Sequence, residues 1–393
     1  MNRLAQRVAR TSTMLALGLP AFLAHAAPYT ANQQAFSDAL GFLSSPSFPS
    51  GPPPVFDTLL LSILSDIPDA DLPYIYSQLS ADSHGSFTSS LMFSDIGLSS
   101  APLANMRRSM DDDSQQPSLW AQVGAGRQRI DGDGNGAQMR QDQRRSVFGG
   151  DLPIAGGWRL GGALGYGEDK LNSSSRDASA ATITDSYSLY GGRDLKLPSS
   201  SLRFFGGAAY SRHDLSSSRR VAFPDDPQRN KGSYDLTTQQ VFGEVALNLP
   251  MGKPGYLEPF FGLLVIEQNS DSFNERGGIS AASVDSQSNR LLVSSLGSRG
   301  KQKFKVGGRD LLLAGHATWR NLQGDLRPEV DLQLAGTNKF TIQGTEMPRN
   351  SLLLEVKADY SLTRNVILDI DYNGAFSSGS NSHFVALNAH WKM

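Results

Sequence analysis

The 393-residue sequence predicts an all-β fold, an antiparallel barrel of about twelve strands that spans a membrane. Three observations carry this prediction. The chain begins with a pattern typical of an export signal. Its composition, with 39 glycines and only 19% charged residues, favours strands and turns over helices. From Ser118 to the end, short segments alternate between apolar and polar residues.

The export signal occupies residues 1–26. Three arginines within the first ten residues precede the apolar run MLALGLPAFLA. Ala24 and Ala26 then supply the small residues of a cleavage site, and we expect cleavage after Ala26. The apolar run is too short for a transmembrane helix, which needs about 20 residues. A membrane assignment must therefore rest on strand periodicity.

Bulk properties exclude some classes of protein. The formal net charge of -2 provides no basic field for nucleic acid. The chain has no cysteine, so an exported protein of this sequence cannot rely on disulfides. Strand pairing and barrel closure must supply its stability instead.

Residues 27–113 differ in texture from the rest and are expected to form a short Ser/Pro-rich and helical segment before the barrel, which covers residues 114–393. The stretch SSPSFPSGPPPVF cannot be one regular element. Around it lie four short helical patterns, NQQAFSDALGFL, DTLLLSIL, SFTSSLMFSDIGL and PLANMRRSM. The first places Phe36, Leu40 and Leu43 on one face.

The barrel prediction rests on about a dozen alternating segments of roughly ten residues, the length of a tilted membrane-spanning strand. In VILDIDYNGAF, for example, Leu368, Ile370 and Tyr372 share one face, and Asp369 and Asp371 share the other. The segments begin near Leu119, Arg144, Trp158, Thr182, Leu202, Thr237, Leu257, Ser288, Asp310, Leu352, Val366 and His383. Short connections such as SLTRNV contrast with a long polar one, SSSRRVAFPDDPQRNKGSYD, in which we place Arg219 and Arg220.

The faces of these segments argue against a soluble β-sandwich, which would have to bury its carboxylates or expose its apolar face. In a membrane barrel the polar face lines the lumen. The predicted lumen wall includes Arg159, Glu244, Glu355, Lys357, Asp369 and Asp371. Aromatic residues near segment ends would form the interfacial girdles: Tyr166, Tyr210, Tyr372, Phe376 and Trp391.

No catalytic or metal motif survives inspection. The run DGDGNG places Asp131, Asp133, Asn135 and Asp142 at the spacing of a calcium loop, but its flanks read as strands and its composition is that of a hairpin turn. There is no Gly-x-Ser-x-Gly elbow, and the six histidines are scattered. We therefore predict no cofactor, no metal and no enzymatic activity.

Two blocks of sequence resemble a known family. The block WAQVGAGRQRIDGDGNGAQMRQDQRRSVFGGDLPIAGGWRLGGALGYGEDKL and the closing block KFTIQGTEMPRNSLLLEVKADYSLTRNVILDIDYNGAFSSGSNSHFVALNAHWKM resemble the first and last strands of the C-terminal translocator domain of bacterial type V autotransporters. The stretch FDTLLLSILSDIPDADLPYIYSQLSADSHGSF is similar to the helical segment before such barrels, although QLSADSHGSF departs from the acidic form expected after Leu-Ser.

The resemblance implies a twelve-stranded barrel with a helix in its pore, drawn here from residues 86–113. Small residues on the lumen side, Gly161, Ala163, Gly165 and Gly207, would leave room for that helix. Lumen arginines could hold it through carboxylates such as Glu244 or Asp369.

The last strand resembles the signal read by the outer-membrane barrel assembly machinery. Its apolar face would carry Val385, Leu387, Trp391 and Met393, although the chain ends in methionine and its aromatic residue is Trp391.

The expected function is export or display of a very short N-terminal segment from the outer membrane of a Gram-negative cell. The expected partners are membrane lipid and the assembly machinery, without nucleic acid, and we expect a monomer. Two alternatives remain open at this point. The protein could be a channel or structural barrel without export, or a small surface adhesin with residues 27–85 outside the cell.

Overall fold

The computed structural model describes residues 29–41, 55–111, 116–252, 255–306 and 309–393. The predicted export signal and its cleavage site at Ala24 and Ala26 lie outside these residues, as does Leu43. The boundary expected after residue 113 also falls in a part that is not described. The last described helix ends at Asp111, and the first strand begins at Ser118.

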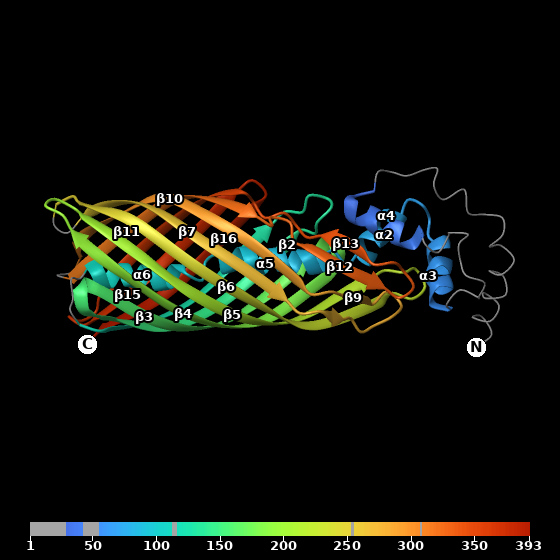
Figure 1. The fold of residues 1–393 in the computed structure, drawn as a ribbon, viewed down its shortest axis with the longest axis horizontal. Helices are drawn as coiled ribbons and strands as arrows, with labels where there is room; N and C mark the ends of the chain where they lie inside the picture. The colour runs from blue at the N-terminus through green and yellow to red at the C-terminus, as the bar shows by residue number, and fades with distance from the viewer. Residues whose placement is uncertain (1–28, 42–54, 112–115, 253–254, 307–308) are drawn as a thin grey trace.

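Twelve strands form a closed antiparallel barrel (Figure 1), which confirms the predicted fold class. The first and last strands close it, with Ser118 opposite Lys392 and Ile130 opposite Ser380. Each of the twelve predicted segments corresponds to one barrel strand. The barrel strands are β1 (Ser118–Ile130), β2 (Met139–Pro153), β3 (Trp158–Ser173), β4 (Ala178–Lys196), β5 (Ser201–Val221), β6 (Gln228–Pro250), β7 (Tyr256–Ser270), β10 (Gln287–Val306), β11 (Arg309–Gly324), β14 (Asn350–Ser361), β15 (Val366–Ser377) and β16 (Ser380–Lys392).

The outer surface of the barrel is apolar because alternate side chains of every strand point away from the lumen. Leu189 is 74% exposed, Val241 66% and Val356 60%, values that a soluble protein would not combine in one belt. The five aromatic residues assigned to the girdles also lie on this surface.

Several strands are longer than the expected ten residues. β5 has 21 residues and β6 has 23. The prediction that residues 216–235 form a long polar loop is therefore wrong, because only residues 222–227 connect the two strands and Arg219 and Arg220 belong to β5. Outside the lipid, both faces of a strand tolerate polar residues, so its sequence no longer differs from that of a loop.

A small sheet continues the barrel at the end away from the C-terminus (Figure 1). It consists of β8 (Phe273–Asn274), β9 (Ala282–Val284), β12 (Glu329–Leu334) and β13 (Phe340–Gln343), in the order β13-β12-β9-β8. These strands are too short for periodicity to reveal them in the sequence.

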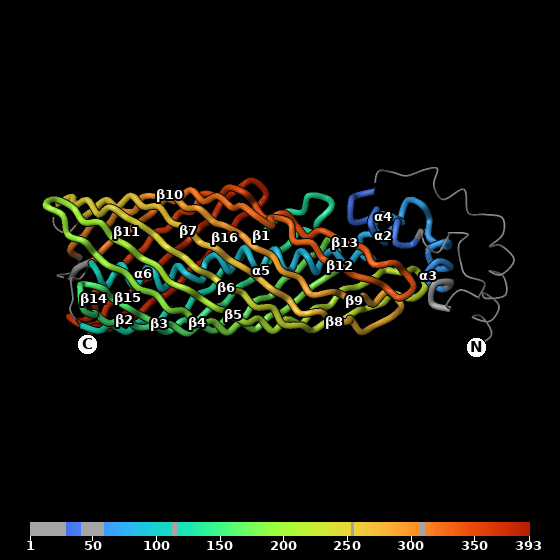
Figure 2. The backbone as a smooth tube through the Cα atoms, viewed as in Figure 1, coloured from blue at the N-terminus to red at the C-terminus, as the bar shows by residue number. Residues whose placement is uncertain are grey.

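All four predicted helical patterns form helices. The helices are α2 (Ala31–Gly41), α3 (Val55–Ser65), α4 (Leu72–Leu79), α5 (Ser83–Asp95) and α6 (Ser100–Asp111), with single 3-10 turns η3 (Ala155–Gly157) and η4 (Ser174–Arg176). Figure 2 shows α5 and α6 running inside the barrel along its length, and α2, α3 and α4 beyond its far end. The expected pore helix is thus two helices that begin at residue 83. In the described part of the chain, no helix is both long and apolar enough to cross a membrane.

Candidate functional site: the helix-filled lumen

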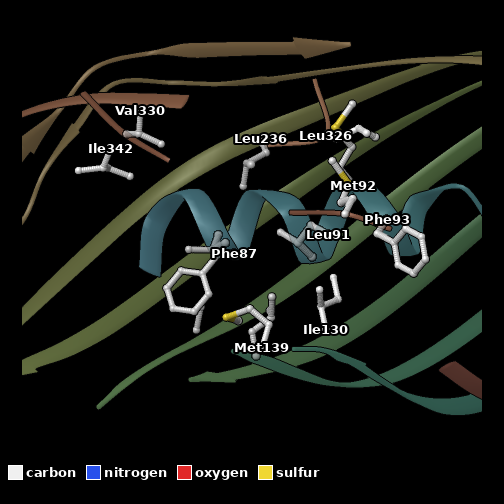
Figure 3. Packing of buried hydrophobic residues seen from close by; sticks show 14 of the residues in the cluster. Phe87, Leu91, Met92, Phe93, Ile130, Met139, Leu236, Leu326, Val330 and Ile342 are labelled. Carbon is white, nitrogen blue, oxygen red and sulfur yellow. The ribbon is translucent and has the colours of Figure 1, made fainter. Parts of the chain in front are cut away.

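In the half of the lumen away from the C-terminus, which we call the upper half, apolar side chains of the wall enclose α5. All 13 residues of α5 are buried. In Figure 3, Phe87 and Leu91 point toward Met139 and Ile130, and Met92 points to the other side of the helix. We call the surrounding wall residues the apolar collar; each is at most 1% exposed: Ile130, Met139, Leu171, Leu215, Leu236, Ile266, Leu291 and Leu322. The collar surrounds α5 with side chains from eight strands.

The composition of α5 suits a helix enclosed on all sides. Its sequence, SHGSFTSSLMFSD, mixes large apolar residues with small hydroxyl residues. Several hydroxyls donate to carbonyls of the same helix, as Ser89 does to Gly85 at 3.1 Å and Thr88 to His84 at 3.2 Å. These residues therefore need no partner from the wall, and the strands can approach the helix closely.

At the end of the barrel away from the C-terminus, which we call the mouth, a buried charge cluster joins α5 to the wall. Glu275 accepts from Arg219 at 2.6 Å, and His84 Nε2 lies 2.9 Å from the same carboxylate. Arg219 also donates to the carbonyl of Gln78 at 2.8 Å. Burial raises the pKa of Glu275, but the charge of Arg219 and the hydrogen bond with His84 outweigh it, so the net pKa falls below its usual value of 4.5.

A second ion pair lies just before α5. Arg176 Nε is 2.9 and 3.0 Å from the two carboxylate oxygens of Asp82. Burial is the largest influence on this carboxyl group and raises the pKa of Asp82 to about 6, although Arg176 opposes the shift.

Close backbone contact also holds α5 at the mouth. A Cβ atom at Gly85 would lie 2.9 Å from Gly344 Cα in the connection after β13. The hydroxyl of Ser86, one residue further, is 3.0 Å from that of Thr345. Asn32 of α2 in turn donates to Gln343 at 2.8 Å, so the outer helices and the pore helix share one support.

A cavity of about 270 Å³ lies beside the break between α5 and α6. Gly97 and Arg107 of the helical segment line it, together with Arg145, Glu244 and His316 of the wall. Above it, Asp95 at the end of α5 accepts from Thr238 at 2.8 Å and is 3.0 Å from His213 Nε2. The lumen changes character at this level from apolar to polar.

In the lower half of the lumen, which lies toward the C-terminus, ion pairs hold α6. Arg108 lies 2.8 Å from Asp359 and 2.9 Å from Asp369. Arg107 lies 3.6 Å from Glu244. At the end of α6, Asp111 pairs with Arg203 at 2.7 Å and with Lys301. We call this region the ionic lower lumen.

The predicted lumen-wall residues all point inward in this region. Lys357 is 3.2 Å from Asp369, and Glu355 is 3.6 Å from His316. Asp371 accepts from Asn388 at 2.7 Å. Arg159 pairs with Asp151 at 2.6 Å near the start of the barrel.

Sequence reasoning missed the helix side of these contacts. We expected wall arginines to hold the helix, and Arg203 of β5 does so at Asp111. At Glu244 and Asp369 the arrangement is reversed, because Arg107 and Arg108 belong to α6 and the carboxylates belong to the wall. The RR pair in PLANMRRSM was visible in the sequence. Its partners were not, because Arg108 and Asp369 are 261 residues apart.

The explanation of the small lumen residues was also wrong in part. A Cβ atom at Gly161 would lie 2.6 Å from the ring of Tyr190, and one at Gly207 would lie 2.6 Å from the ring of Phe242. These glycines make room for aromatic rings of neighbouring strands, rather than for the helix. The glycine that α6 approaches is Gly192, which faces Met110.

The residues with calcium-loop spacing do not converge. Asp133 accepts from the backbone of Gly136 at 2.7 Å and pairs with Arg327, which is turn chemistry with one added ion pair. Asp131 pairs with Arg129, and Asp142 lies on β2 and pairs with Arg127. Asn135 instead accepts from the backbone of Asn32 at 2.7 Å. Within the described ranges, no three acidic, histidine or cysteine side chains are grouped to hold a metal ion.

On the last strand, Val385, Leu387, Trp391 and Met393 lie on the outer surface, each between 46% and 58% exposed. His383 and His390 lie on opposite faces, as their spacing requires. Asn388 and His390 point into the lumen and contact Asp369.

Comparison with known proteins agrees with this geometry. The sequence model of the autotransporter beta-domain matches residues 119–373. An extracellular serine protease of Serratia marcescens is 25% identical over 289 residues, which are 73% of this chain and 27% of that protein. The chain thus spans about a quarter of the length of this curated relative.

Two solved structures share the fold. The translocator domain of the autotransporter NalP from Neisseria meningitidis has a TM-score of 0.59 at 18% identity, covering 78% of this chain and 98% of the other. The beta domain of the Bordetella autotransporter BrkA has a TM-score of 0.52 at 15% identity, covering 71% and 100%. The family match extends over more than half of the chain, and the fold matches that of solved translocator barrels. This chain therefore belongs to the autotransporter beta-domain family, and it forms an outer-membrane translocator barrel of type V secretion.

Proposed function

We propose that this barrel displays its own short N-terminal segment at the cell surface, with α5 and α6 as the part that stays in the pore. The supporting observation is the path of the chain. β1 begins and β16 ends at one end of the barrel, whereas α2, α3 and α4 lie beyond the other end (Figure 2).

The loops indicate which end is outside. Short connections, such as residues 197–200 and 362–365, join strands at the end that holds the C-terminus. The longest connections, including the one with β12 and β13, lie at the opposite end. Outer-membrane barrels have short periplasmic turns and longer extracellular loops, so α2, α3 and α4 belong outside the cell.

Protease treatment of intact cells tests this proposal. An epitope tag inserted after Ala27 is expected to be removed by external protease. The same tag inserted in residues 197–200 is the control and is expected to survive until the cells are opened. A protected tag after Ala27, in cells whose barrel is folded, would contradict surface display.

The route to the membrane is part of the same proposal. An export signal cleaved after Ala26 would deliver the chain to the periplasm, and the mature protein would begin at Ala27. Mass spectrometry of the purified protein gives the N-terminus directly. A chain that retains residues 1–26 in the outer membrane would contradict this route.

The last strand is proposed to be the part that the assembly machinery reads. Trp391→Asp places a charge on the lipid face, where it is costly, and Asn388→Asp adds the same charge inside the lumen. We expect the first variant to reach the outer membrane in much smaller amount than the second. Equal amounts in membrane fractions would contradict this assignment.

The role proposed here is physical and not catalytic, and the barrel is expected to act as a monomer. A channel without export is the competing function. Deleting residues 86–113 should raise the single-channel conductance of the purified protein, because α5 and α6 fill the lumen. If the deletion leaves the conductance unchanged, the helices in the lumen do not limit the flow of ions through the barrel.

A further inference from the structure

One sector of the outer surface changes abruptly from apolar to basic. On β3, the outward residues from Trp158 to Tyr166 are apolar and exposed, and they cover about 27 Å along the strand at ~3.3 Å per residue. The next outward positions toward the cell surface are Glu168 and Lys170. Tyr166 therefore marks the outer edge of the lipid belt in this sector.

Five basic residues lie beyond that edge on three adjacent strands, over about 20 Å of strand, and we call them the basic patch: Arg127, Arg129, Arg140, Arg144 and Lys170. All five side chains point outward. The strand register sets Arg144 opposite Glu168, and Arg140 opposite Arg129. The patch thus forms rows that rise from the belt toward the cell surface.

Part of the patch forms no ion pair within the residues that the structure describes. Arg127 pairs with Asp142 at 2.7 Å, and Arg129 pairs with Asp131 at 2.6 Å. Across the described ranges of the chain, Arg140, Arg144 and Lys170 make no ion pair, although Glu168 lies across from Arg144. These cations remain available to an external anion.

The outward charges just beyond the belt differ around the barrel. On β4 to β7 they are mainly acidic, namely Asp185, Asp214, Asp235 and Glu267, with Arg212, and basic residues follow further out at Arg220, Arg229 and Lys231. Arg212 is already paired with Asp235 at 2.6 Å. The sector of β1 to β3 carries two acidic outward residues on its strands, Asp142 and Glu168, beside its five basic ones.

A groove of about 560 Å³ runs along the outer surface directly below the patch. Apolar side chains of three strands line it, including Val123, Val385 and Leu387, with Tyr166 at its edge. Arg144, Arg145 and Glu168 line the same groove. Arg144 makes no ion pair within the described residues, and an apolar channel that ends at its guanidinium has the shape and chemistry of a site for a lipid with an anionic head.

We propose that this sector binds a phosphorylated lipid of the outer leaflet. Its phosphate groups contact Arg140 and Arg144, and an acyl chain lies in the groove. Guanidinium groups bind phosphate through paired hydrogen bonds, and basic residues beside the lipid belt attract anionic headgroups. Because β1 and β16 form the closing pair, the lipid would also cover the seam of the barrel. The proposal rests on the orientation of the barrel given under the proposed function, but it does not require surface display of the N-terminal segment.

Lipid binding to the purified full chain in an uncharged detergent tests this site. The probes are diphosphoryl lipid A, a glucosamine disaccharide lipid with two phosphates, and zwitterionic phosphatidylethanolamine, titrated separately by native mass spectrometry. The test variant is Arg140→Ala with Arg144→Ala. The matched control is Arg290→Ala, an outward arginine on β10, which stands opposite β2 in the ring of strands. Heat-dependent gel mobility verifies that each barrel is folded.

We expect wild-type protein and Arg290→Ala to bind lipid A equally and more tightly than phosphatidylethanolamine. The double variant should bind lipid A roughly 30-fold more weakly, about fivefold for each arginine. Equal binding by wild type and the double variant, or an equal loss in Arg290→Ala, would overturn the proposal. Inorganic phosphate is the last probe. If it binds wild type as tightly as lipid A does, the site takes a free anion and the lipid assignment fails.

Discussion

The two halves of the lumen hold their helices by different forces. Around α5, the apolar collar and the side chains of Phe87, Leu91 and Met92 form a buried apolar core. Around α6, arginines and carboxylates pair across a polar space, with a cavity above them. The helix sequences and the wall differ together: α5 presents apolar and hydroxyl residues to the collar, and α6 presents Arg107, Arg108 and Asp111 to charged wall residues.

The two halves therefore contribute in different ways: apolar burial stabilises the helices in the lumen, and ion pairs fix where α6 lies. Burial of apolar surface stabilises by about 25 cal/mol per Å², and α5 contributes nearly its whole surface. Buried ion pairs offset their own desolvation and add little net stability, but they fix the register of the groups that pair. We therefore expect the upper half to retain the helices in the pore and the lower half to align α6 without holding it strongly. The mouth cluster of His84, Arg219 and Glu275 adds to the upper half.

The largest expected effect comes from a charge in the collar. Leu91→Asp would place a carboxylate among aliphatic side chains and cost about 4 kcal/mol or more. Helices α5 and α6 should then leave the lumen, and single-channel conductance of the purified protein should rise. Leu59→Asp is the control, because Leu59 is 41% exposed outside the barrel. A closed channel in Leu91→Asp would show that the collar is not the main seal.

The mouth cluster offers the second test. Arg219→Ala leaves Glu275 buried without its main partner, which should cost roughly 3–5 kcal/mol. Hydrogen exchange of the α5 amides should accelerate accordingly. Arg220→Ala alters the neighbouring residue, whose side chain is 46% exposed, and should leave exchange unchanged. Similar exchange in both variants would assign no role to the buried pair.

Acid should weaken the mouth cluster in a defined direction. Burial raises the pKa of Glu275, but Arg219 and His84 outweigh it, so the folded pKa is lower than the unfolded one. Its contribution is therefore full above about pH 4.5 and falls by up to about 1.4 kcal/mol per pH unit below that value. The raised pKa of Asp82, about 6, acts in the opposite sense, because protonation then favours the folded state as pH falls toward 4.

Exchange of the α5 amides at pH 3.5 and 5.5 measures this effect. The two contributions oppose each other in the wild type, so Asp82→Asn, which removes the opposing one, should lose protection between pH 5.5 and pH 3.5. The double variant Asp82→Asn with Glu275→Gln should lack most of that loss. An equal loss in the double variant would place the acid sensitivity in another group.

The smallest effect is expected in the ionic lower lumen. Arg107→Met should change the protection of α6 by less than about 1 kcal/mol, because Glu244 keeps its partner Arg299 and methionine retains the packed chain. Hydrogen exchange of the α6 amides provides the measurement. A loss as large as that of Arg219→Ala would reverse the comparison and make the lower half the main support.

Much of the barrel could be predicted from the sequence. The twelve strands, their outward faces and the parity of the last strand follow from alternation, because the outside of every strand meets the same apolar medium. The outward orientation of Leu368 and Ile370 therefore follows from their spacing alone. The short helices were also visible as local patterns. The family resemblance supplied the idea of a helix in the pore.

The lumen contacts depended on the tertiary structure. Arg219, expected in a loop, lies on a strand and contacts Glu275. Arg108 contacts the carboxylate of Asp369, which is 261 residues away in the sequence. The collar around α5 has no local signature either, whereas the separation of α5 from α6 was visible as two helical patterns. A lipid-facing residue needs only the right parity, whereas a lumen residue needs a particular partner. That partner is fixed only when the barrel closes and sets the register of all its strands.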